Sequence, residues 1–128
     1  MLVEEALKAQ AFPFKMTHFR DGVEALNALT GESVSPGVPD VLVLDLNMPR
    51  MGGLELLAIL KRHQLFRNVP VAILTSSLQP EEKEQARRLG AHRFVRKPVD
   101  LYEFLDRVGH TLRDLIENGR RGELTWID

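Results

Sequence analysis

The chain has 128 residues, the length of one domain, and its 44% hydrophobic and 27% charged residues are typical of a soluble globular protein. Its 17 basic and 18 acidic residues give a net charge of −1, so no broad basic field attracts nucleic acid. Cysteines are absent, which excludes thiolate metal sites and cysteine nucleophiles, and no apolar run approaches the roughly 20 residues of a membrane span. We therefore expect a cytoplasmic protein that binds neither nucleic acid nor membrane.

The first part of the chain is predicted to alternate between helices and strands. Residues 2–10 are strong helix formers with one apolar face. Residues 14–19 carry aromatic and β-branched side chains and predict a strand at an edge of the sheet. A short helix over 23–29 and a loop rich in Gly, Ser and Pro over 30–39 follow. The apolar run over 40–44 is typical of a strand that is buried on both faces.

The second part continues this alternation. A helix, a strand, a helix, a strand and a helix are predicted over residues 54–63, 69–75, 80–89, 92–95 and 101–118. Asp100 is the predicted N-cap of the last helix, with Glu103 at the capping-box position. We divide the chain into a domain over residues 1–118 and a C-terminal tail over 119–128, whose structure the pattern leaves unassigned.

Alternating strands and helices predict an α/β fold, a parallel sheet with helices on both faces. Functional sites in such sheets lie at the carboxyl ends of the strands. Asp45, Thr75 and Lys97 each lie at or just past a predicted strand end. We therefore expect a carboxylate, a hydroxyl and an ammonium group at one rim of the sheet.

Three segments, VLVLDLNMPRMGG, VPVAILTSS and GAHRFVRKP, closely resemble the receiver domains of two-component response regulators. They occur in the family's order and at its spacing, and the resemblance extends over about residues 1–113. It implies the receiver fold, which is a flavodoxin-like doubly wound parallel sheet. It also implies a signal-transduction protein in a phosphorelay, which accepts a phosphoryl group from a histidine kinase and switches its binding to a downstream protein. We therefore expect the protein to act as a switch and not as an enzyme.

The resemblance assigns a role to each candidate site residue. Asp45 corresponds to the phosphoacceptor, whose carboxylate attacks phosphorus to form an aspartyl phosphate. Asp45 and the backbone carbonyl of Asn47 correspond to ligands of Mg²⁺, which prefers hard oxygen donors. Thr75 corresponds to the switch hydroxyl that bonds a phosphoryl oxygen, and Lys97 to the cation that pairs with the phosphate. Phe94 corresponds to the aromatic switch residue that changes rotamer with Thr75.

One strand of the family has no counterpart in the matched segments. That strand is central in the sheet and ends in two acidic residues that help to hold Mg²⁺, so we expect an N-terminally truncated receiver fold. Three alternatives follow. The sequence begins inside the family's domain, or strand 14–19 pairs directly with strand 40–44, or another segment fills the gap. That segment could come from a partner chain or from GELTWID, which would bring Glu123 and Asp128 near the site.

Two classes of function remain open at this point. The first is a stand-alone receiver, with a narrower resemblance to small regulators associated with phytochrome-type histidine kinases and with dimerisation as a possibility. The second is a degenerate receiver that acts as a protein interaction module without phosphorylation, which the missing acidic pair favours. A flavin or nucleotide binder is disfavoured, because the turn after residues 41–44 lacks a Gly-rich phosphate cradle.

Overall fold

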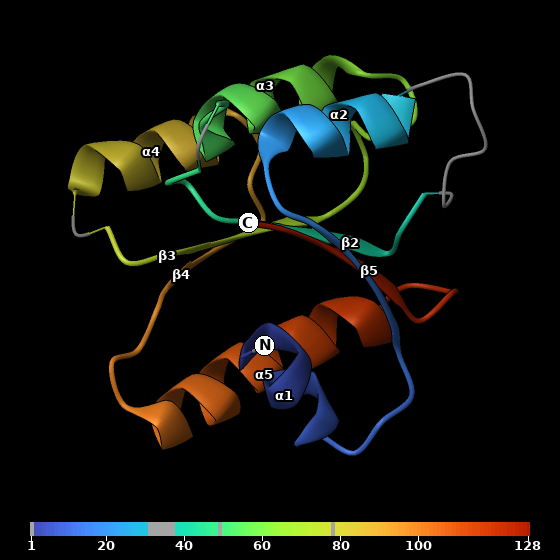
Figure 1. Ribbon diagram of the computed structural model, residues 1–128, viewed down its shortest axis with the longest axis vertical. Helices are drawn as coiled ribbons and strands as arrows, with labels where there is room; N and C mark the ends of the chain where they lie inside the picture. The colour runs from blue at the N-terminus through green and yellow to red at the C-terminus, as the bar shows by residue number, and fades with distance from the viewer. Residues whose placement is uncertain (1, 31–37, 49, 78) are drawn as a thin grey trace.

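Parallel strands form one sheet, and helices cover both of its faces, in the computed structural model (Figure 1). The structure describes residues 2–30, 38–48, 50–77 and 79–128. The helices are α1 (Leu2–Lys8), α2 (Gly22–Thr30), α3 (Gly53–Arg62), α4 (Pro80–Arg88) and α5 (Leu101–Glu117). The strands are β1 (Lys15–Phe19), β2 (Val41–Leu44), β3 (Val71–Thr75), β4 (Arg93–Arg96) and β5 (Glu123–Ile127). The predicted α/β fold is confirmed.

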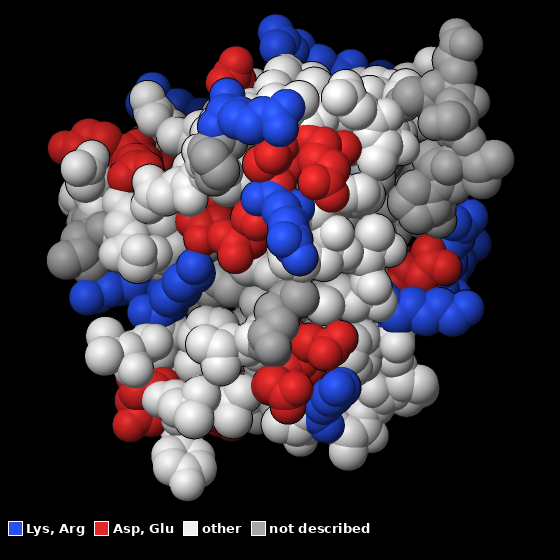
Figure 2. All heavy atoms as spheres, viewed as in Figure 1, with Lys and Arg blue, Asp and Glu red and all other residues white. Residues whose placement is uncertain are grey.

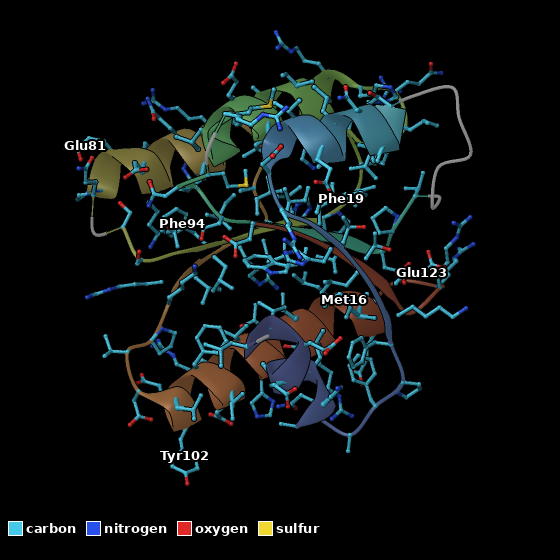
Figure 3. All side chains as sticks on the ribbon, viewed as in Figure 1. Met16, Phe19, Glu81, Phe94, Tyr102 and Glu123 are labelled. Carbon is cyan, nitrogen blue, oxygen red and sulfur yellow. The ribbon has the colours of Figure 1, made fainter. Side chains whose placement is uncertain are left out.

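The two layers of helices explain the continuous apolar runs of β2 and β3, in which every residue is buried. Successive side chains of a strand point to opposite faces. Leu42 packs in the cluster that includes α2, α3 and α4, whereas Val43 packs in the cluster that includes α1 and α5. On the edge strand β1, Phe19 belongs to the first cluster and Met16 packs against the second (Figure 3).

The strand order is β1-β5-β2-β3-β4, so the last strand of the sequence lies inside the sheet. β5 pairs in parallel with β1 on one side and with β2 on the other. Its Leu124 and Trp126 side chains are buried on the side of α1 and α5, and Ile127 is buried on the opposite side. The segment that the sequence analysis sets apart as a tail is therefore a strand of the domain.

β5 occupies the central position that the sequence analysis leaves without a strand. The spatial order matches the flavodoxin-like order 2-1-3-4-5, with the last strand of this sequence in the place of the first. Direct pairing of β1 with β2 is wrong, because β5 separates them. The expected gap of a truncated sheet is also wrong, since Glu123–Ile127 supplies the backbone hydrogen bonds that β1 and β2 need.

The predicted helices and strands agree with the structure to within about two residues at most of their ends. The Asp100 side chain accepts a hydrogen bond from the Glu103 amide at 3.0 Å, as expected of an N-cap. Most of the predicted loop over 30–39 lies outside the described residues. Within the part of the chain that the structure describes, no helix has the length and apolarity to span a membrane.

The start of α3 is packed against the end of β2, and this contact predicts a cost for any side chain at Gly53. A Cβ atom there would lie 2.8 Å from the Cα atom of Leu46 and would overlap the backbone carbonyl of Asp45. We expect Gly53→Ala to lower the free energy of unfolding, measured in urea, by about 1–3 kcal/mol. The matched control is Gly52→Ala, whose Cβ would meet only the Leu46 carbonyl oxygen, at 3.8 Å. Equal losses in both variants would contradict the close approach.

Candidate functional site

Asp45 follows β2 directly, and its side chain is buried at the carboxyl end of the sheet. Its Oδ2 atom lies 2.6 Å from the Nζ atom of Lys97, and its Oδ1 atom accepts a hydrogen bond from the Asn47 amide at 3.0 Å. A buried carboxylate is costly unless it is paired and hydrogen-bonded. The ammonium group and the amide satisfy both requirements while they hold the carboxylate at the rim.

Thr75 and Lys97 reach the rim from β3, which is next to β2, and from β4, which lies beyond β3. Thr75 is the last residue of β3 and is fully buried, and Lys97 follows β4. The Lys97 amide donates to the Thr75 carbonyl oxygen at 2.7 Å, which fixes the two residues relative to one another. The Thr75 hydroxyl oxygen accepts a hydrogen bond from the Ser77 amide at 3.1 Å. The structure therefore brings Asp45 and Lys97 into contact and places Thr75 at the neighbouring strand end.

Asp128 is a second carboxylate at this rim, and the sequence suggested it only as one of several alternatives. The residue follows β5, and its amide donates to the Phe19 carbonyl oxygen at 2.9 Å. On the other side of β5, the Asp45 amide donates to the Ile127 carbonyl oxygen at 3.1 Å. These bonds place Asp128 and Asp45 side by side at the carboxyl ends of neighbouring strands. Partial burial and the negative charge of Asp45 raise the pKa of Asp128, and the charge of Lys97 opposes that rise.

The donor set at this rim fits a magnesium ion. Asp45 and Asp128 offer two carboxylates, and the backbone carbonyl of Asn47 offers a further hard oxygen. Within the described residues no group of three or more acidic, His or Cys side chains could hold a metal. Mg²⁺ does not require one, because it is commonly bound through one or two carboxylates and keeps several waters. Burial, and after it the negative charge of Asp45, raises the pKa of Asp128, and a cation would offset the repulsion between the two carboxylates.

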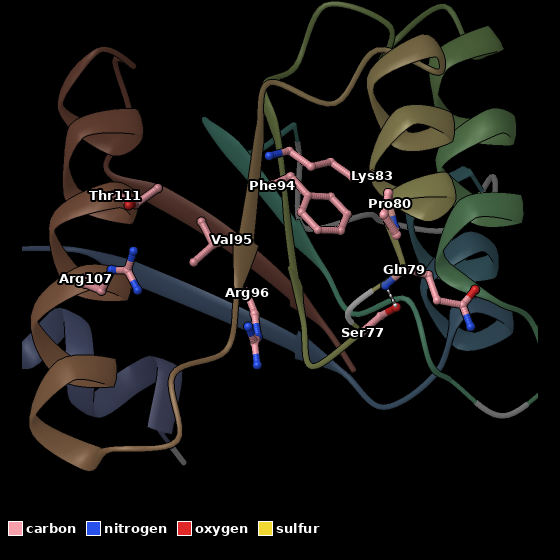
Figure 4. Close-up of a pocket in the computed structure, with 9 residues that line it drawn as sticks. All are labelled: Ser77, Gln79, Pro80, Lys83, Phe94, Val95, Arg96, Arg107 and Thr111. Carbon is pink, nitrogen blue, oxygen red and sulfur yellow. Dashed lines mark hydrogen bonds between the residues drawn. The ribbon is translucent and has the colours of Figure 1, made fainter.

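Phe94 lies on the opposite side of β3 from β2, in β4, where it is half-buried beneath α4. Figure 4 shows its ring between β4 and α4, in a pocket of about 480 Å³ whose lining includes Ser77, Pro80 and Lys83. Ser77 is the residue that connects this pocket to the rim, because its amide bonds the Thr75 hydroxyl and its own hydroxyl bonds Glu82 of α4. Ser77 therefore links Thr75 to the pocket that Phe94 lines, a connection that the sequence did not reveal.

Charged side chains of both signs alternate on the face shown in Figure 2. The paired arginines of α4 illustrate this arrangement, because Arg87 and Arg88 both bond to Glu84, at 2.6 Å and 3.2 Å. Hydrogen bonds and charge from these arginines lower the pKa of Glu84 to about 2. This arginine pair thus belongs to a solvated helix face.

The chain is similar to proteins of one family over most of its length. The family model described as response regulator receiver domain matches residues 1–109. The response regulator Rcp1 of Synechocystis sp. is 29% identical over 109 residues, which cover 84% of this chain and 74% of the relative. The solved Mn²⁺-bound form of response regulator Rcp1 has a TM-score of 0.84 at 27% identity, covering 94% of this chain and 88% of that one. The phosphorylated cyanobacterial phytochrome response regulator RcpA has a TM-score of 0.83 at 26% identity, covering 93% and 86%.

Proposed function

The chain belongs to the response regulator receiver domain family, and from this premise we propose that it is a single-domain response regulator of a phosphorelay. It accepts a phosphoryl group on Asp45 from a histidine kinase and thereby changes its binding to a downstream protein. In this proposal it acts in the cytoplasm as a switch and is not itself an enzyme.

The observation that carries the proposal is the buried Asp45 carboxylate in direct contact with Lys97, beside the strand end that holds Thr75. In the transfer, a carboxylate oxygen of Asp45 forms a bond to phosphorus, the bond from phosphorus to the donor's histidine nitrogen breaks, and its electron pair leaves with that nitrogen. Lys97 is placed to offset the negative charge of the incoming phosphoryl group. The Thr75 hydroxyl exchanges its bond to the Ser77 amide for one to a phosphoryl oxygen.

Asp45, Asp128 and the Asn47 carbonyl are the groups that would hold Mg²⁺ in this proposal. When bound, the ion neutralises charge on the carboxylates and on the phosphoryl oxygens. The two aspartates lie at the same rim because β2 and β5 are neighbours in the sheet, and Asn47 follows Asp45 by two residues. The similar structure of the Mn²⁺-bound form of Rcp1 supports the proposal that this chain binds a divalent ion.

The proposed partners follow from the same similarities. The phosphorylated phytochrome response regulator RcpA supports a phytochrome-type histidine kinase as the phosphoryl donor. The change at Thr75 reaches Phe94 through Ser77, so the pocket between β4 and α4 is the proposed place where phosphorylation alters binding to the downstream protein. Association of two copies of this chain into a homodimer stays a prediction.

Incubation with acetyl phosphate and Mg²⁺, followed by intact-mass measurement, tests this function. We expect the unmodified chain to gain the mass of one phosphoryl group and Asp45→Asn to gain none, because an amide is a poor nucleophile toward phosphorus. Excess EDTA should suppress the gain in the unmodified chain. An equal gain in both proteins, or none in either, would refute phosphorylation of Asp45.

The alternative, an interaction module that needs no phosphate, is less well supported by the structure than by the sequence. Its main support is the missing acidic pair, and Asp128 supplies one carboxylate beside Asp45. The buried Trp126 precedes Asp128 by two residues and reports on the site by fluorescence. A saturable Mg²⁺ response favours the response regulator, and a flat titration favours the module.

A further inference from the structure

We propose that Asp40 is a positioning residue that holds β5 in register from the end of the sheet opposite the candidate site, and so places Asp128 beside Asp45. The metal part of this inference rests on the proposed function, whereas the part that concerns β5 does not. Asp40 directly precedes β2, and Asp45 directly follows it. Asp40, at the start of β2, therefore lies near the start of β5, and Asp45, at the end of β2, lies near the end of β5.

The Asp40 carboxylate accepts hydrogen bonds from backbone amides of the turn that leads from α5 into β5. Its Oδ1 atom accepts from the Arg120 amide at 3.0 Å, and its Oδ2 atom accepts from the amides of Arg121 and Glu123, each at 3.0 Å. The Asp40 amide also donates to the Glu123 carbonyl oxygen at 2.9 Å. One side chain therefore satisfies three backbone donors that a turn would otherwise leave to water.

The turn is shaped to fit this carboxylate. A Cβ atom at Gly119 would overlap the Asp40 side chain, and Gly122 adopts a φ of +66° that favours glycine. Burial raises the pKa of Asp40, but the amide hydrogen bonds from Glu123, Arg120 and Arg121 outweigh it and lower the pKa below its ordinary value. Asp40 is therefore a charged acceptor at neutral pH, and hydrogen bonds of this kind are among the stronger ones in proteins.

The register of β5 decides where Asp128 lies. Leu124 is paired with Val41 of β2, and Ile127 is paired with Leu44 at the end beside Asp45. A slip of one residue would move Asp128 by about 3.3 Å and turn Trp126 to the opposite face. Because Asp40 binds the first residue of β5 through both its amide and its carbonyl group, it fixes the register at the point where the strand begins.

Three variants of the full chain test this inference. Asp40→Ala removes the acceptor, and Asp40→Asn keeps a neutral acceptor of the same size. The matched control is Asp106→Asn, which changes an exposed carboxylate of α5 that pairs with His110 of its own helix. Two quantities are measured, Mg²⁺ affinity from Trp126 fluorescence and amide hydrogen exchange over residues 123–128, with and without saturating Mg²⁺.

We expect Asp40→Ala to weaken Mg²⁺ binding by about tenfold and to accelerate exchange over 123–128. Saturating Mg²⁺ should restore part of that protection, because an ion that binds only the docked strand must favour docking by the same factor. Asp40→Asn should fall between Asp40→Ala and the unmodified chain, and Asp106→Asn should match the unmodified chain.

Each other outcome has a definite meaning. Unchanged exchange over 123–128 in Asp40→Ala would overturn the inference, as would faster exchange with unchanged Mg²⁺ affinity. If the unmodified chain shows no Mg²⁺ response, the metal role of Asp128 fails, while the exchange data still decide whether Asp40 holds β5. Should Asp40→Ala fail to fold, Asp40→Asn carries the same comparison with a smaller expected change.

Discussion

Replacing Trp126 by alanine should lower the free energy of unfolding by about 3–5 kcal/mol, a large part of the stability of an ordinary domain. The side chain is 3% exposed, and its ring stacks on His18 of β1 with 6.4 Å between ring centroids. It packs in the cluster between the sheet and the helices α1 and α5. Removing it would leave a cavity between the middle of the sheet and these two helices. Urea unfolding followed by circular dichroism measures the loss.

The control for this prediction is an aromatic residue that contributes no core packing. Tyr102 of α5 is 83% exposed and points away from the molecule (Figure 3). Tyr102→Ala should change the free energy of unfolding by less than about 0.5 kcal/mol. If Trp126→Ala were as mild as Tyr102→Ala, β5 would not be a strand of the sheet, and Asp128 would have no fixed place at the rim.

Replacing Asp128 by asparagine should weaken Mg²⁺ binding by at least about tenfold. The change removes one of the two carboxylates at the rim and keeps the shape of the side chain. Because burial and the negative charge of Asp45 both raise the pKa of Asp128 and so disfavour its ionised form, its neutralisation should leave the stability of the metal-free protein equal or higher. A Mg²⁺ titration followed at Trp126 gives the affinity, and urea unfolding gives the stability.

Glu123→Gln is the matched control, because it neutralises a carboxylate of the same strand at the end away from the site (Figure 3). Its backbone bonds to Asp40 do not involve the side chain that changes. We expect its Mg²⁺ affinity to equal that of the unmodified chain. Equal weakening in both variants would mean that the net charge of β5, and not the position of Asp128, governs the response.

Much of the fold could be predicted because its signals are local. The apolar runs that end at Leu44 and Thr75, the cap at Asp100 and the periodicity of the helices each depend on neighbouring residues. Parallel strands then bring their carboxyl ends together, so Asp45 and Lys97 could be expected at one rim from chain order alone. The contact between them at 2.6 Å agrees with that expectation.

The place of β5 could not be predicted in the same way. Leu124 and Trp126 alternate with polar Thr125, but a pattern this short leaves both the structure of the segment and its neighbours unassigned. Its partners β1 and β2 lie far away in the sequence, and the pairing depends on the space that they leave between them. The hydrogen bonds between Asp40 and the turn before β5 are likewise long-range contacts, and no local sequence pattern around Asp40 predicts them.

The central claim is that Asp45 is the residue that receives the phosphoryl group, and it can be tested by trapping the product. Sodium borohydride reduces an aspartyl phosphate to homoserine, so peptide mass spectrometry after treatment with acetyl phosphate and Mg²⁺ identifies the modified position. We predict homoserine at position 45 and an unmodified aspartate at position 128. Homoserine at any other aspartate, with Asp45 intact, would contradict the account.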